Sequence, residues 1–160
     1  MGKYLASSLL SGLILTLSTQ PVLGETGALG GYQPQLPGDY SAKLAVVDLE
    51  KARMSFMRKC SSCHDHKRQG GHGKGPHLWN LMGRMAGSVA GFNFSDGMKS
   101  SGHVWDYASL NYYLTDTERA VPGRAMNFRG LKREKDRVLL IAFLRTLHDN
   151  PPPLPWRSVP

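Results

Sequence analysis

The chain of 160 residues has few cysteines, few acidic side chains and no long hydrophobic run beyond its first 24 residues. Its two cysteines, Cys60 and Cys63, are too few for a disulfide-rich scaffold. Without further apolar runs of about 20 residues, a multi-pass membrane protein is excluded. With 12 acidic against 20 basic side chains, the net charge of +8 suits an acidic partner protein, an anionic membrane surface or a nucleic acid. A hydrophobic fraction of 41% excludes a collagen and a wholly disordered chain.

The first 24 residues have the pattern of a secretory signal. Lys3 supplies a positive start, and Val22 and Gly24 stand at positions −3 and −1 of a cut before Glu25. The apolar core between them consists mainly of Leu9, Leu10, Leu13, Ile14, Leu15 and Leu17. Serine, glycine and threonine interrupt this core, which is shorter than the ~20 apolar residues of a spanning helix. We therefore expect export to the periplasm with cleavage of residues 1–24, and an uncleaved membrane anchor is the alternative.

The rest of the chain predicts an all-α domain at residues 46–149 between two irregular ends. Glycine and proline are frequent at 25–45, which predicts an irregular leader, and the prolines of 150–160 predict a stiff, extended tail. Helices are expected at 48–59, 105–114 and 133–148 from their caps and apolar spacing. The apolar faces of these helices comprise Leu49, Ala52 and Phe56, then Leu110, Tyr113 and Leu114, and then Leu140, Phe143, Leu144 and Leu147. A chain with so few helices and such a long glycine-rich loop at 65–103 needs something else to fold around, which indicates a large cofactor.

Residues Cys60-Ser61-Ser62-Cys63-His64 form a C-x-x-C-H motif, the attachment signal for haem c. Two thiols at this spacing can add to the two vinyl groups of one haem, and the adjacent imidazole can bind its iron. A dithiol redox pair usually has a strand–helix context with flanking hydrophobic residues, which is lacking here. A zinc site would need a second ligand pair, for which His66, His72 and His77 but no cysteines are present. A plain disulfide is the structural alternative, and the adjacent His64 and the secretory route favour haem.

A six-coordinate haem iron needs a second axial ligand from elsewhere in the chain. Met126 has the best context, because it follows Pro122-Gly123 on a loop placed to fold back over the haem. A thioether ligand favours the reduced iron and raises the reduction potential. The other candidates are His66, His72, His77, His103 and His148, and Met54, Met57, Met82, Met85 and Met98. His66 is too close to the attachment motif to reach the opposite face of the haem.

Further motifs follow C-x-x-C-H in a fixed order along the chain. They are the run Gly75 to Arg84, Gly91-Phe92, Trp105, Leu110 to Leu114, Val121-Pro122-Gly123, Met126-Asn127-Phe128 and Leu140 to Leu144. From Val47 to about Leu147 the sequence thereby resembles the class I, mitochondrial-type cytochrome c family, which includes bacterial periplasmic members. The resemblance implies a fold in which the N- and C-terminal helices cross and loops wrap around one covalently bound haem.

The resemblance also implies how the haem is held. Cys60 and Cys63 carry the thioether bonds, His64 is the proximal iron ligand and Met126 is the distal ligand. The carbonyl of Pro76 accepts the other ring N–H of His64 and so fixes the orientation of the imidazole.

Four more residues acquire roles from the same resemblance. Tyr113 lies beside Met126 in the haem pocket, and Phe128 guards the exposed haem edge. Arg84 and Trp105 reach a haem propionate, whose buried charge needs such donors.

The sequence departs from the family pattern at several of these places. Ala52 replaces a glycine where the two helices cross, and Arg124 replaces a threonine of the distal loop. Phe94 and Met98 replace a tyrosine and an asparagine, which removes polar groups near the haem. Glu118 and Ala125 replace two lysines of the family's docking ring, while Lys59, Arg119, Lys132 and Arg133 keep part of it.

The expected function is that of a soluble periplasmic one-electron carrier and not of an enzyme. Partners implied by the resemblance are redox proteins of a respiratory chain, such as a membrane cytochrome bc-type complex, a terminal oxidase or a reaction centre. A monomer with transient docking at the membrane surface is expected, and nucleic acid is not. The alternatives are a haem subunit of a periplasmic dehydrogenase or oxidase, and an open-site haem peroxidase or gas sensor.

Overall fold

The structure, a computed structural model, describes residues 27–155. The expected signal at 1–24 and the end of the proline-rich tail at 156–160 lie outside the described residues. Six helices and long loops make up the described part, which contains no β-strand beyond an isolated bridge between Met85 and Val104. The prediction of an all-α fold is therefore confirmed. None of the helices within 27–155 combines the length and apolar character needed to cross a bilayer.

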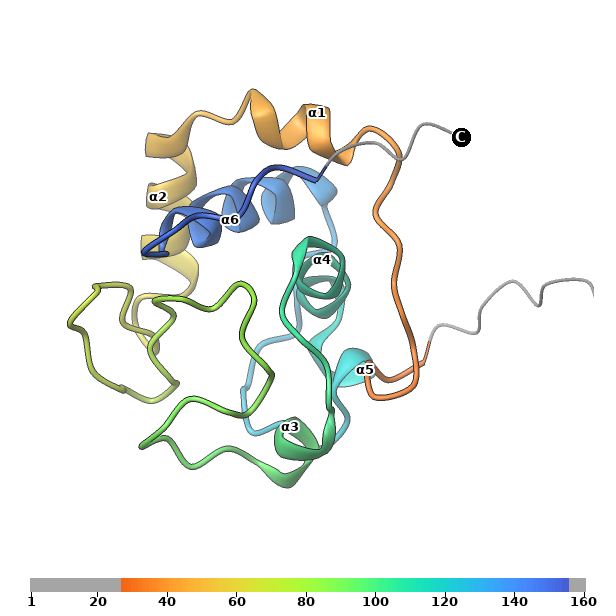
Figure 1. The fold of residues 1–160 in the computed structure, drawn as a ribbon, viewed down its shortest axis with the longest axis vertical. Coiled ribbons are helices and arrows are strands. Elements are labelled where there is room, and N and C mark those ends of the chain that lie inside the picture. Colours follow the sequence, from red (N-terminus) through yellow and green to blue (C-terminus); the bar gives the residue numbers. More distant parts are fainter. Residues whose placement is uncertain (1–26, 156–160) are drawn as a thin grey trace, which may run out of the picture.

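Two helices from opposite ends of the domain pack together, α2 (Leu49–Lys59) and α6 (Glu134–Thr146) (Figure 1). Asp48 starts α2 as expected, because its carboxylate accepts the N–H groups of Glu50 and Lys51. Phe56 is fully buried, with its ring centroid 5.0 Å from that of Phe143 on α6. The predicted apolar stripe of α6 is buried along its length, whereas Leu49 is 52% exposed and was wrongly assigned to the inner face of α2.

A third helix, α4 (Tyr107–Thr115), packs on α6 and continues into α5 (Thr117–Ala120). It begins two residues later than predicted, because Asp106 is its cap: the Asp106 carboxylate accepts the Ser109 N–H at 2.7 Å, and the Ser109 hydroxyl accepts the Asp106 N–H at 2.8 Å. The predicted inner face of α4 is buried. The glycine-rich loop at 65–103 holds only the five-residue helix α3 (Asp96–Ser100), as the lack of periodicity suggested.

The leader predicted at 25–45 is irregular only in part and belongs to the core. Tyr40–Ala45 form the helix α1, whose Tyr40 and Leu44 are buried at i, i+4 spacing against α6. Before α1, an extended segment runs from beside α5 up to the crossing helices (Figure 1). Leu29, on this segment, is 2% exposed and its N–H donates to the Ala120 carbonyl at 2.8 Å. The prediction of a wholly irregular leader was wrong because surrounding glycines and prolines obscured two spaced apolar residues.

The described start of the tail, up to residue 155, is bound to the domain. The Arg145 Nε group donates to the Pro152 carbonyl at 2.8 Å, and the Tyr107 hydroxyl donates to the Pro153 carbonyl at 2.9 Å. Leu154 packs against the core. Both ends of the described chain therefore pack against α4, α5 and α6. The loop at 65–103 and the loop after α5 are left to line a cavity.

Candidate functional site

A cavity of about 500 Å³ lies between α2, α4, α6 and the two long loops. This volume is within the roughly 300–1,000 Å³ typical of small-molecule and cofactor pockets. The lining is mainly apolar and aromatic, and it includes every residue for which the sequence predicted a role in haem binding. These residues are Cys60, Cys63, His64, Pro76, Arg84, Trp105, Tyr113, Met126 and Phe128.

One side of the cavity, which we call the proximal wall, consists of Cys60, Cys63, His64, Gly75 and Pro76. The motif lies where α2 ends: the Cys60 carbonyl accepts the N–H groups of Cys63 and His64, at 3.0 and 2.9 Å. The His64 Nδ1 atom lies 2.7 Å from the Pro76 carbonyl oxygen, which therefore accepts the Nδ1–H. This bond leaves Nε2, at the other edge of the ring, as the nitrogen with a free lone pair. The contact expected between His64 and Pro76 is present.

Gly75 fixes the position of the His64 ring through close backbone approach. A Cβ atom at Gly75 would lie 2.4 Å from His64 Cε1, so no other residue fits there without displacing the imidazole. The Gly75 N–H also donates to the Cys63 carbonyl at 2.8 Å, which ties the loop back to the motif. These contacts hold the His64 imidazole in one orientation, as expected for a fixed axial ligand.

Burial sets the protonation states of the proximal wall. It lowers the pKa of His64 below its usual value, against the opposing effect of the hydrogen bond to Pro76, so the imidazole is neutral and able to donate a lone pair. Burial also raises the pKa of the Cys60 thiol to about 12. Cys60 and Cys63 are not joined to each other by a disulfide.

A second part of the lining, which we call the distal wall, consists of Tyr113 on α4 and Arg124 and Met126 on the loop after α5. Behind it, the Thr117 hydroxyl of α5 contacts Arg124. The Tyr113 hydroxyl donates to the Met126 sulfur at 3.5 Å. Of the six candidate methionines, only Met98 and Met126 line the cavity. None of the five candidate histidines does. Two of the candidate thioethers therefore line the cavity, and the Met126 sulfur accepts a hydrogen bond from Tyr113.

The predicted propionate donors lie on the cavity wall, but Arg84 is already engaged. Its guanidinium donates to the carbonyls of Trp79 at 3.2 Å and His77 at 3.3 Å. Trp105 is 6% exposed and packs edge-on against Tyr113, with ring centroids 5.1 Å apart. Phe128 lies at the cavity and is partly buried. Phe94 and Met98, the two apolar departures, also line it, so the polar groups they replace are lost from the cavity itself.

The proposed docking ring is only partly available as free positive charge. Lys59 is exposed at the cavity, together with Lys74, which the sequence analysis missed because it stands in an unpatterned loop. Lys132 pairs with Asp116 and Arg133 pairs with Asp136. The Arg119 guanidinium lies over the Tyr112 ring, 4.9 Å from its centroid. Lys59 and Lys74 are therefore the exposed positive charges that line the cavity.

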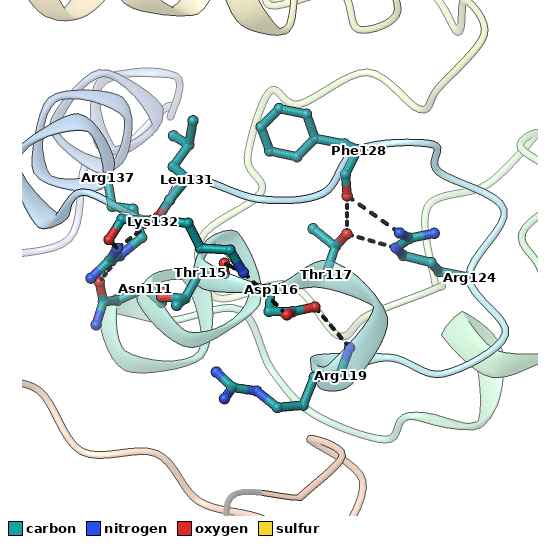
Figure 2. Close-up of polar contacts among 10 residues, drawn as sticks. All are labelled: Asn111, Thr115, Asp116, Thr117, Arg119, Arg124, Phe128, Leu131, Lys132 and Arg137. Carbon is teal, nitrogen blue, oxygen red and sulfur yellow. Dashed lines mark hydrogen bonds and ion pairs between the residues drawn. The ribbon is translucent and has the colours of Figure 1, made fainter.

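Arg124 makes more contacts than its place in a loop suggested. Figure 2 shows its guanidinium directed at Thr117 and at the backbone carbonyl of Phe128. The sequence marked Arg124 as a departure but contained no signal for these partners. Within the described part of the chain, no three histidine, cysteine or acidic side chains gather as they would around a zinc ion.

Comparison with known proteins agrees with this geometry. A family model described as "Cytochrome c" matches residues 49–148. Cytochrome c of Chlamydomonas reinhardtii is 39% identical over 104 residues, which cover 65% of this chain and 93% of the relative. Cytochrome c2 of Rhodomicrobium vannielii is 46% identical over 104 residues, covering 65% and 82%. A cytochrome c homolog of Bradyrhizobium diazoefficiens is 36% identical over 116 residues, covering 72% of this chain and 62% of that protein.

Proposed function

Because this chain belongs to the class I cytochrome c family and has its all-α fold, we propose that it is a periplasmic one-electron carrier with a His64/Met126-ligated haem. Membership of the family implies one covalently attached haem c and electron transfer with redox partner proteins. The observation that carries the finer proposal is one cavity whose lining includes Cys60, Cys63, His64 and Met126, with the Met126 sulfur hydrogen-bonded to Tyr113.

The residues of the cavity fit such a group and have distinct tasks. Cys60 and Cys63 would hold the haem through thioether bonds, and the neutral His64 imidazole would donate Nε2 to its iron. Met126 would supply the sixth ligand, with Tyr113 donating to its sulfur at 3.5 Å. When bound, the haem supplies an iron that gains or loses one electron. The apolar wall around it keeps water away, so that little reorganisation accompanies a change of charge.

The exposed lysines beside the cavity would guide the approach of a partner. Lys59 and Lys74 are exposed at the cavity, next to where an electron would leave. A charged rim of this kind raises the rate of encounter with an acidic surface more than it raises affinity. The partners implied by the resemblance are a membrane cytochrome bc-type complex, a terminal oxidase or a reaction centre, reached by transient docking.

Export would place the protein in the periplasm. The signal pattern at 1–24 supports this proposal. Mass spectrometry of the purified protein tests the proposal directly. A mass for residues 25–160 plus one haem is expected, and a full-length product found in the membrane fraction would show an anchor instead.

The carrier itself is tested by extraction and spectroscopy. In acidified organic solvent, the haem should stay with the polypeptide, because two thioether bonds hold it. The intact protein should titrate reversibly with one electron and should not bind carbon monoxide, since Met126 occupies the sixth position. Free haem in the extract would overturn covalent attachment, and ready binding of carbon monoxide would favour the open-site alternative.

Steering by the rim is tested by charge reversal. Lys59→Glu and Lys74→Glu should each slow electron transfer to an acidic partner by a few-fold at low salt and weaken its salt dependence. The matched control is Lys135→Glu, an exposed lysine of α6 that does not line the cavity. Equal slowing in all three variants would contradict a localised docking face.

A further inference from the structure

The loop that carries Met126, residues 121–128, is attached to α5 at both of its ends. At its start the Val121 N–H donates to the Thr117 carbonyl at 3.0 Å. At its end the Thr117 hydroxyl donates to the Phe128 carbonyl. Thr117 is fully buried, so its hydroxyl is fixed by packing as well as by hydrogen bonds. One residue of α5 thus defines where the loop leaves and where it returns.

Arg124 joins the middle of the loop to the same point (Figure 2). Its Nε group donates to the Thr117 hydroxyl at 2.6 Å, and its Nη2 group donates to the Phe128 carbonyl at 3.4 Å. Its Nη1 group pairs with Glu118 at 3.1 Å. The other carboxylate oxygen of Glu118 accepts the Gly123 N–H at 3.3 Å. All three nitrogens of the guanidinium therefore contact either a residue of α5 or the Phe128 carbonyl at the end of the loop.

The short segment bounded by Arg124 and Phe128 contains Met126. Both of its ends reach Thr117, one through a side chain and one through a backbone carbonyl. Arg124 also lines the cavity, and its side chain is only 13% exposed. A guanidinium so far removed from water must be fully hydrogen-bonded, and charge-assisted bonds of this kind are stronger than neutral ones. We call these hydrogen bonds among Arg124, Thr117 and Phe128 the bracket. They hold the part of the loop that contains Met126.

The charge of Arg124 also reaches the residue that contacts the Met126 sulfur. Burial raises the pKa of Tyr113 to about 12, and the positive charge of Arg124 acts against that rise. The charge of Arg124 therefore acts on the phenol that donates to the thioether, in addition to the contacts of Arg124 with Thr117 and Phe128.

We infer that Arg124 is a positioning residue. Its planar guanidinium ties the middle and the end of the loop to Thr117 and so keeps the Met126 thioether facing the cavity. The inference rests on the proposed ligand role of Met126. It requires the planar guanidinium and not the charge alone, because a lysine ammonium on a flexible stem does not present the same pair of fixed donors.

Amide hydrogen exchange in the haem-loaded protein tests the bracket without reference to the iron. The Arg124 and Phe128 amides donate within the loop, to the carbonyls of Val121 and Met126. In Arg124→Gln they should exchange about tenfold faster or more, because a charge-assisted bond to each end is lost. Arg124→Lys should exchange nearly as fast as Arg124→Gln. Thr117→Val removes the shared partner and should give the same pattern, so the test survives if one variant fails to fold.

A second readout follows the methionine–iron charge-transfer band near the red end of the spectrum. In Arg124→Gln, added imidazole should abolish this band at about a tenfold lower concentration than in the unmodified protein, which corresponds to a tenfold weaker hold on the ligand. The matched control is Arg129→Gln, which removes one exposed positive charge just beyond the loop. Exchange and band should be unchanged in that variant.

The possible failures are distinct. Unchanged exchange in Arg124→Gln overturns the bracket, and so does exchange in Arg124→Lys that is as slow as in the unmodified protein, because charge alone would then suffice. Equal effects in Arg129→Gln overturn it as well. Faster exchange with an unchanged band supports the bracket and contradicts the ligand role of Met126, which is a failure of the proposed function.

Discussion

Both walls contribute side chains to the lining of the cavity, but the two walls are built differently. The proximal wall is local: its groups lie between Cys60 and Pro76 and are fixed by backbone contacts, of which the His64–Pro76 bond at 2.7 Å is the clearest. The distal wall is assembled from α4, α5 and a loop, and side chains hold it together. Local construction makes the proximal wall rigid, whereas the distal wall depends on packing from several directions.

That difference is also visible behind each wall. The proximal wall is supported by Gly75, whose backbone touches the His64 ring. The distal wall is supported by the N-terminal segment, because the Leu29 N–H donates to the Ala120 carbonyl at the end of α5. Gly97 of α3 adds to this support, since a Cβ there would lie 2.2 Å from the Pro122 carbonyl oxygen. The distal wall is therefore expected to open first when the protein is stressed.

The largest effect should come from filling the space behind His64. In Gly75→Val the added Cβ would lie 2.4 Å from the imidazole, so the destabilisation should reach or exceed the upper end of the ~1–3 kcal/mol typical of overpacking. Most of the purified protein should lack the low-spin spectrum of a His64-ligated haem. Gly71→Val is the control, since a Cβ there meets no atom within 4 Å. A normal spectrum in Gly75→Val would contradict a rigid proximal wall.

An effect confined to the distal wall is expected from Leu29→Ala. Leu29 is 2% exposed, and truncation of such a residue costs about 2–5 kcal/mol. Exchange of the α5 and loop amides should accelerate, while the Gly75 amide, bonded to Cys63, should stay protected. Val46→Ala, at an 83% exposed position, should change neither. If Gly75 lost protection together with α5, the two walls would not be independent.

The contrast explains what the sequence could predict. The C-x-x-C-H motif and the Asp48 cap are local patterns, and each is found where the sequence placed it. The role of Leu29 depends on a backbone bond to Ala120, a residue far along the chain, and no local pattern encodes such a contact. The helix α5 has four residues, too few for apolar periodicity. Arg124 was visible as a departure, but its partner Thr117 is revealed only when the loop is folded.

The smallest effect should follow removal of the hydroxyl beside the thioether. Tyr113→Phe deletes the bond to the Met126 sulfur, and sulfur is a weak acceptor, so the stability should change by less than about 1 kcal/mol. The red-end band should persist at neutral pH. If the band disappeared at neutral pH, Tyr113 would be the main support of the distal wall, and not the contacts of Arg124 with Thr117.

The ligand role of Met126 is the central claim, and one spectroscopic comparison tests it most directly. Met98 and Met126 are the two methionines that line the cavity, so each is substituted in turn and the red-end charge-transfer band and the reduction potential are recorded. Met126→Ala should retain covalent haem, lose the band, gain carbon monoxide binding and show a much lower potential, since axial ligands span about 0.8 V. Met98→Leu should keep the band. A band that survives in Met126→Ala and disappears in Met98→Leu would contradict the assignment.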